Sequence, residues 1–166
     1  MIARAFPNRA FEEDYLRNAT RRLTTVILSA TSAIATLAGP AQAAANPYTA
    51  AGACANEFGG SWSSASDGHR TISSGSTKVG DVYLMYNGST GYNCVVTLKS
   101  VSVGTASGVG AWLLVQGSDW RADEASYKYY AAIQRPAADK CVQYTGEVLY
   151  GTSWVSNGRY TWGNCG

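Results

Sequence analysis

The clearest structural signal in this chain lies at residues 81–99, which read DVYLMYNGSTGYNCVVTLK. Residues 81–86 and 93–103 are apolar runs rich in Val, Tyr and Leu, a composition typical of β-strands. Between them, Asn87-Gly88 and Gly91 adopt positive φ angles at little cost, so the segment predicts an antiparallel hairpin. Alternation along the second strand puts one set of side chains on the core face. The set expected there is Cys94, Val96 and Leu98.

The chain after residue 45 keeps this β character and has no long segment with a 3.6-residue apolar repeat. A strand is expected at residues 111–117, which are apolar on both faces and therefore central in a sheet. Residues 46–77 and 118–126 are expected to be mainly turns and loops, with a short strand near His69. Further strands are predicted at residues 127–134, 141–144, 148–150 and 158–162. The pattern predicts an all-β fold, a compact antiparallel β-sandwich or flattened barrel of about 7–8 short strands.

Residues 1–45 have the order of a cleaved secretory signal peptide. A long basic segment precedes a weakly apolar run at residues 23–37, and small residues follow around Ala43. The alternative is a retained helix or anchor, but the run is too short and too rich in Thr, Ser and Ala for a membrane span. Arg21-Arg22 leaves both the general secretory and the twin-arginine route open. We therefore expect a single secreted β-domain at residues 46–166, with no transmembrane anchor after cleavage.

Removal of this leader changes the charge of the protein. Five of the 13 basic residues and three of the 11 acidic residues lie before residue 46, so eight of each remain. The secreted domain is then neutral, with its charges scattered along the chain. Such a distribution offers no electrostatic footprint for nucleic acid and no polybasic patch for a membrane.

All four cysteines, Cys54, Cys94, Cys141 and Cys165, lie in the predicted secreted domain. An even number of cysteines in an exported domain predicts two disulfides. Four cysteines allow three connectivities, and we favour the sequential pairs Cys54–Cys94 and Cys141–Cys165 over the nested arrangement. The sequential pairs would close loops of about 41 and 25 residues, each contributing roughly 3.5–4 kcal/mol in the chain-entropy model.

The sequence contains none of the common catalytic or phosphate-binding motifs. His69, its only histidine, is interpreted as a solvated loop residue and has no companion at metal-ligand spacing. Asp119, Asp123 and Glu124 form the one acidic cluster, with Arg121 among them, and are interpreted as a solvated surface. We therefore predict no enzymatic activity, no cofactor and no metal site. A glycoside hydrolase that uses this cluster is the less favoured alternative.

The aromatic residues are the remaining candidates for a functional surface. All five tryptophans and ten of the 11 tyrosines follow residue 45. Aromatic rings in rows on a sheet can stack on sugars or form a protein interface, although packing in the core is the more common role. The residues predicted to form an aromatic binding face are Tyr127, Tyr129, Trp154, Tyr160 and Trp162.

An ordered series of segments across most of residues 46–166 resembles the spore-associated protein A family, small exported proteins of filamentous actinomycetes. The segments that carry the resemblance are Asn46-Pro47-Tyr48-Thr49, residues 82–87, residues 93–99, residues 101–106, Val115-Gln116-Gly117, residues 123–131, Lys140-Cys141-Val142 and Cys165-Gly166. The family has no assigned enzymatic activity, so the resemblance implies no catalytic residue. Ala125 stands where glycine is usual in the family, residues 131–133 replace a turn that contains Gly-Pro, and residues 57–70 are individual to this chain.

The resemblance implies a secreted, non-catalytic protein associated with the spore or cell surface, as a structural or adhesive coat component. Its expected partners are wall or spore-surface glycans or a coat protein, with no nucleic acid. A secreted module that binds a ligand or inhibits an extracellular enzyme is the alternative.

Overall fold

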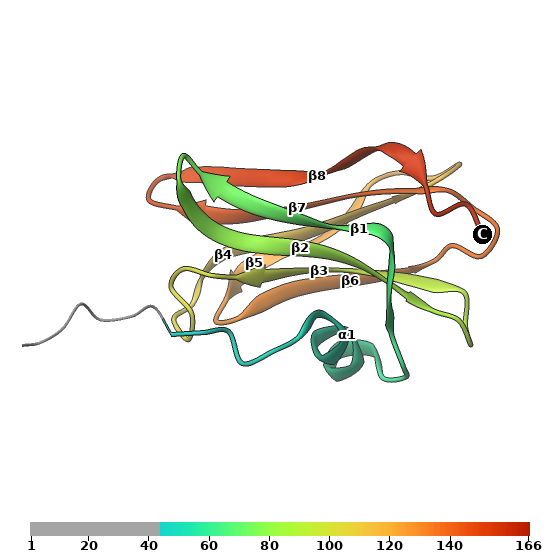
Figure 1. The fold of residues 1–166 in the computed structure, drawn as a ribbon, viewed down its shortest axis with the longest axis horizontal. Helices are drawn as coiled ribbons and strands as arrows, with labels where there is room; N and C mark the ends of the chain where they lie inside the picture. Colours follow the sequence, from blue (N-terminus) through green and yellow to red (C-terminus); the bar gives the residue numbers. More distant parts are fainter. Residues whose placement is uncertain (1–43) are drawn as a thin grey trace, which may run out of the picture. The chain divides into compact units, whose positions relative to one another are not determined.

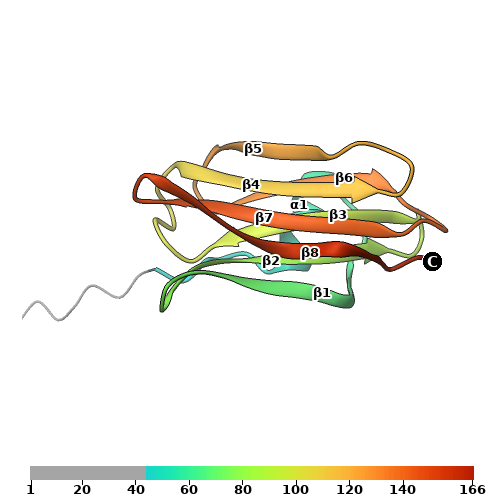
Figure 2. The same ribbon diagram turned by 90° about the horizontal axis from the view of Figure 1, so that it is seen from above.

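The computed structural model describes residues 44–166, which form eight antiparallel strands in two sheets and one short helix. In chain order the elements are α1 (Ala50–Phe58), β1 (Ser63–Ser74), β2 (Thr77–Asn87), β3 (Tyr92–Lys99), β4 (Ser107–Val115), β5 (Arg121–Tyr127), β6 (Tyr130–Pro136), β7 (Val142–Tyr150) and β8 (Ser153–Gly163). Sheet A has the strand order β1-β2-β3-β6, and sheet B has the order β5-β4-β7-β8. The two sheets stack face to face (Figures 1 and 2). The prediction of a β-sandwich is confirmed.

The hairpin predicted at residues 81–99 is the pair β2–β3 at the centre of sheet A. Its turn is held by Asn87, whose side-chain oxygen accepts hydrogen bonds from the backbone N–H groups of Ser89 and Thr90 at 3.0 and 3.3 Å. Gly91 closes the turn at φ +70°, a conformation that favours glycine. Strand β3 ends at Lys99 rather than at residue 103, because the chain turns there to cross to sheet B.

Strand β3 is buried on both faces, so the expected burial of Cys94, Val96 and Leu98 is confirmed and the opposite face is buried as well. Cys94, Val96 and Leu98 are buried, but they pack beneath α1 together with Trp62. The opposite set fills the space between the sheets, where Val95 lies in the main core and the Thr97 hydroxyl donates to the Gly110 carbonyl at 2.7 Å. Figure 1 shows α1 on the side of sheet A that faces away from sheet B. Sheet A is thus the middle of three layers.

Helix α1 lies within residues 46–77, a region that the sequence pattern predicted to consist mainly of turns and loops. The Thr49 hydroxyl caps it by accepting from the Gly52 N–H at 3.0 Å, and Gly59 ends it at φ +70°. Its buried contacts are made by Ala53 and Cys54, small residues that leave little amphipathic signal in the sequence. The prediction of loops was also wrong for most of residues 63–74 and 121–126, which are the edge strands β1 and β5.

Two disulfides link Cys54 to Cys94 and Cys141 to Cys165. The first ties α1 to β3 and is fully buried at both cysteines. The second joins the chain just before β7 to the segment after β8. No helix within residues 44–166 is long and apolar enough to cross a membrane. The predicted leader, residues 1–45, lies outside the described residues except for Ala44 and Ala45, and its cleavage stays a prediction.

Candidate functional site

The five residues predicted to form an aromatic face lie in two groups at opposite edges of sheet B. Tyr127 ends β5 and Tyr129 follows it in the turn to β6, whereas Trp154, Tyr160 and Trp162 belong to β8. Strands β5 and β8 are the two edges of this sheet. The structure therefore presents two aromatic surfaces of different shape.

The first surface, which we call the β8 row, consists of Trp154, Tyr160 and Trp162. These side chains are 45%, 58% and 46% exposed, among the most exposed large aromatic groups in residues 44–166. Trp154 pairs with Leu149 on the outer face of sheet B, and the Tyr160 hydroxyl lies 2.9 Å from that of Thr145 on the same face. Tyr160 follows Trp154 by six positions in β8, a backbone distance of about 20 Å at roughly 3.3 Å per residue.

A glycine in the neighbouring strand makes room for the Trp154 ring. Gly108 of β4 lies beside Leu149 of β7. A Cβ atom placed on Gly108 would lie 2.7 Å from Cη2 of Trp154. The indole therefore reaches across β7 to the surface of β4. Any larger residue at position 108 would therefore displace the Trp154 ring from the outer face of sheet B.

Two carboxylates meet on the same outer face, above Gly110 of β4. Gly110 pairs with Glu124 of β5 on one side and with Glu147 of β7 on the other. The Trp112 indole N–H donates to Oε1 of Glu147 at 2.8 Å. Burial raises the pKa of Glu147, the bond from Trp112 lowers it, and the neighbouring Glu124 raises it again, with a net upward shift.

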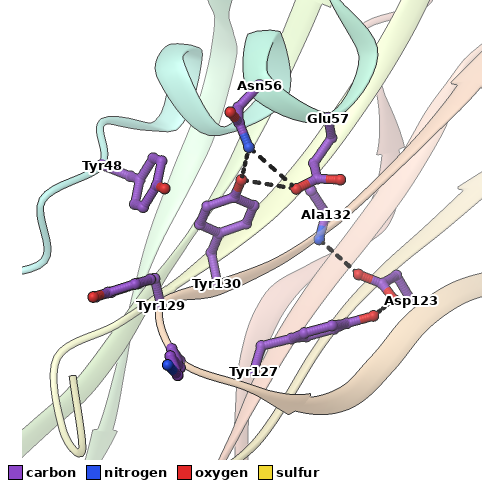
Figure 3. A pocket seen from close by; sticks show the side chains of 9 residues that line it. Tyr48, Asn56, Glu57, Asp123, Tyr127, Tyr129, Tyr130 and Ala132 are labelled. Carbon is purple, nitrogen blue, oxygen red and sulfur yellow. Dashed lines mark hydrogen bonds between the residues drawn. The ribbon is translucent and has the colours of Figure 1, made fainter. Parts of the chain in front are cut away.

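The second surface is a cavity of about 290 Å³ between α1 and the β5–β6 turn, which we call the tyrosine pocket (Figure 3). Four tyrosines and two carboxylates account for most of its lining. The lining residues are Tyr48, Asn56, Glu57, Asp123, Tyr127, Lys128, Tyr129, Tyr130 and Ala132. They come from the segment before α1, from α1 itself and from the β5–β6 hairpin, three parts of the chain that only the fold brings together.

Hydrogen bonds fix the polar side chains of the tyrosine pocket. The Tyr130 hydroxyl donates to Oε1 of Glu57 at 2.8 Å and accepts from the Asn56 amide at 2.7 Å (Figure 3). On the other side, Tyr127 donates to Oδ1 of Asp123 at 2.7 Å, and Oδ2 accepts from the Ala132 N–H at 3.0 Å. Asp123 therefore holds β5 against the edge of β6.

These contacts keep both phenols protonated. Burial raises the pKa of Tyr130 to about 12, and its bond to Glu57 adds to the shift. The bond to Asp123 raises the pKa of Tyr127, with a smaller contribution from burial. Neither tyrosine is therefore suited to act as a base near neutral pH.

The residues considered for catalysis lie on separate parts of the sandwich. His69 is in β1, not in a loop, with Nε2 3.0 Å from Oδ1 of Asp81 and its ring stacked on Tyr83 at 4.5 Å. The acidic cluster is divided, because Asp123 lines the tyrosine pocket while Glu124 points to the outer face of sheet B. Within residues 44–166, no group of three or more His, Cys, Asp or Glu side chains is placed to hold a metal ion.

Sequence reasoning did not find Tyr48, Asn56, Glu57 or Glu147 as site residues. The first three lie in and before a helix that the sequence pattern did not predict, and nothing local marks them. Glu147 had a weak signal, because it alternates with Tyr144, Gly146 and Val148 in a strand whose other face is buried. The approach of its side chain to Glu124 depends on Gly110 of the neighbouring strand β4.

Comparison with protein-family models, curated proteins and solved structures gave no match to this chain.

Proposed function

We propose that this protein is a secreted, non-catalytic binding protein that attaches to a polysaccharide of the cell or spore surface through the β8 row. The observation that carries the proposal is the exposure of Trp154, Tyr160 and Trp162. Single exposed rings are ordinary on a protein surface, whereas large aromatic side chains gathered on one face of a sheet mark interaction sites. Trp and Tyr are also the residues that contribute most at binding surfaces.

A polysaccharide fits this surface better than a protein does. The backbone positions of Trp154 and Tyr160 lie about 20 Å apart along β8 at roughly 3.3 Å per residue, and the outer-face positions between them are Ser156 and Gly158. The core of a protein interface is a continuous desolvated patch, which this spacing does not provide. A glycan chain instead offers apolar sugar faces at intervals, separated by hydroxyl groups that can bond to polar side chains.

Attachment to the spore or cell surface is supported by the resemblance to the spore-associated protein A family and by the features of an exported protein. The predicted leader precedes a domain with two disulfides, which are typical of oxidising compartments outside the cytosol. A coat protein as the partner is the alternative occupant of the row. Sedimentation with purified wall glycan separates the two.

The proposal is tested by sedimentation of the full-length gene product, purified from culture medium, with insoluble wall glycan. We expect a Trp154→Ala, Trp162→Ala double variant to lose about tenfold or more in affinity, because each lost ring removes roughly 0.5–1.5 kcal/mol. Tyr86→Ala is the matched control, since Tyr86 is 37% exposed but lies in sheet A. Equal sedimentation of the wild type and the double variant would refute the proposal.

Location is tested separately, by mass spectrometry of detergent washes from purified spores beside the culture supernatant. The proposal expects peptides of the chain in the washes, and the first peptide would locate the mature N-terminus. Recovery from the supernatant alone would contradict attachment to the spore.

A further inference from the structure

We infer that the tyrosine pocket is a binding site for an organic ammonium ion. This site lies at the β5–β6 end of the sandwich and shares no residue with the β8 row. The inference is therefore independent of the polysaccharide proposal.

The tyrosine rings are arranged as the walls of a cage and not as a flat platform. The rings of Tyr48 and Tyr130 meet edge to face, with centroids 4.8 Å apart and planes at 73°. Tyr48 and Tyr129 are inclined at 53°, with centroids 5.5 Å apart. These tyrosines line the pocket with aromatic surface, and the negative face of a tyrosine ring attracts an ammonium group. Figure 3 shows these rings around the cavity.

The charges of the pocket favour a cation. Glu57 and Asp123 supply two carboxylates, and within residues 44–166 no Lys, Arg or His side chain forms an ion pair with either of them. Lys128 lines the pocket but is exposed at its edge, so the lining carries one net negative charge. The hydrogen bonds of both carboxylates come from neutral donors, namely two phenols, an amide and a backbone N–H. Neutral donors leave the charge uncompensated.

The chemistry selects an organic cation over a metal ion or an anion. Two carboxylates give too few oxygen ligands for Ca²⁺, which takes six to eight. An anion would be repelled by the carboxylates and by the ring faces. An ammonium group carried on carbon gains from both, because its charge meets the carboxylates while its carbon atoms contact the rings.

Contacts within the chain hold the walls of the tyrosine pocket in place. Asp123 links β5 to β6, and the buried Cys54–Cys94 disulfide fixes α1 on β3. Tyr130 connects β6 to α1 through Asn56 and Glu57. A site whose walls are held by such links loses little conformational entropy on binding.

Binding is tested by NMR titration of the full-length gene product with choline and with 3,3-dimethylbutan-1-ol, its uncharged analogue of the same shape. We expect choline to shift the tyrosine ring signals with a millimolar dissociation constant and the alcohol to bind at least tenfold more weakly. Added NaCl should weaken choline binding, because the attraction is partly between exposed charges. Equal binding of the two probes would overturn the inference.

Two further probe pairs identify the source of the ammonium group. Glucosamine against N-acetylglucosamine tests an amino sugar, and Nα-acetyl-lysine amide against its Nε-acetylated form tests a protein side chain. In each pair only the first compound carries the charge. A pocket that binds none of the charged probes is not an ammonium site.

Variants connect the binding to the pocket. Glu57→Gln keeps an acceptor for Tyr130 but removes the charge, and we expect about a 3- to 10-fold loss in choline affinity. Lys128→Gln removes the competing cation and should strengthen binding about twofold or more. Glu147→Gln, on the outer face of sheet B, is the matched control and should leave the affinity unchanged. A Lys128→Gln variant that binds more weakly, or a Glu57→Gln variant that binds normally, would overturn the assignment.

Discussion

The outer faces of the two sheets are built by the same alternation of side chains, yet one is covered and the other is open. On sheet A, Val96 and Leu98 are buried because α1 packs across the strands. On sheet B, Trp154 and Tyr160 occupy the equivalent outer positions and remain half-exposed. No described segment covers them. The two faces differ because α1 covers only sheet A. Aromatic residues under the helix stabilise the fold, whereas those on the open face of sheet B are available for binding.

The first test of this comparison removes the link that holds the cover in place. A Cys54→Ala, Cys94→Ala variant opens the buried disulfide between α1 and sheet A, and we expect a loss of about 4 kcal/mol in the free energy of unfolding. Urea titration at pH 7 measures the loss. The uncovered outer face of sheet A should also bind a hydrophobic dye.

The matched control is Cys141→Ala, Cys165→Ala. The chain-entropy model gives this pair about 3.5 kcal/mol, close to the value for the first pair. Cys54 and Cys94 are fully buried, however, whereas Cys165 is exposed, so the first variant should lose clearly more than the difference in loop length implies. If the second variant were the less stable of the two, α1 would not be anchored in the way described.

The hairpin at residues 81–99 could be predicted because all of its signals are local. Alternation, turn residues and strand propensity lie within the segment itself. The direction of its faces could not be predicted, because both sets of side chains in β3 are apolar enough to be buried. The position of α1 determines which set of side chains faces sheet B. The sequence predicts this helix only weakly, because small residues such as Ala53 make its buried contacts.

The two aromatic surfaces were predictable to different degrees. Trp154, Tyr160 and Trp162 lie close together in one strand, so the sequence brings them together. The tyrosine pocket joins Tyr48 and Glu57 to Asp123 and Tyr130, which are more than 60 residues away along the chain. Nothing in the separate segments encodes that approach, which depends on the docking of α1.

The second test compares the closed and open sides of sheet B with one substitution on each. A Cβ atom on Gly146 would lie 2.6 Å from Cβ of Val82 in the opposite sheet, so Gly146→Ala must push the sheets apart. We expect a loss of about 1–3 kcal/mol in the free energy of unfolding. Gly108→Ala meets the Trp154 ring on the open side. The ring can move into solvent, and the loss should stay below about 1 kcal/mol.

Tryptophan fluorescence completes this comparison. Gly108→Ala should change the emission of the folded protein and weaken glycan binding, because it displaces one ring of the β8 row. Gly146→Ala should lower stability but leave binding intact in the protein that remains folded. The opposite pattern would mean that Trp154 is held by the core and is no part of a binding surface.

The third test uses two carboxylates, one on each outer face, whose pKa values move in opposite directions. Burial opposes ionisation of Asp81, but hydrogen bonds from Lys78, His69 and Thr71 outweigh it and hold its pKa below the usual range. Its stabilisation is therefore complete above about pH 4 and is lost as the pH falls through the lowered value. At pH 7, Asp81→Asn should lose about 1–3 kcal/mol in urea titration, since it breaks charged hydrogen bonds.

Glu147 has the smaller effect and the opposite sign. Its raised pKa means that the folded state binds the proton more tightly, so this contribution to stability is complete below about pH 4 and is lost as the pH rises through the raised value. Glu147→Gln keeps an acceptor for Trp112 and abolishes the titration, so it should change stability at pH 7 by less than about 1 kcal/mol. Urea titrations from pH 4 to 7 should show a shallower decline for the variant than for the wild type. An unchanged decline would mean that neither burial nor the neighbouring Glu124 raises the pKa of Glu147 in the folded protein.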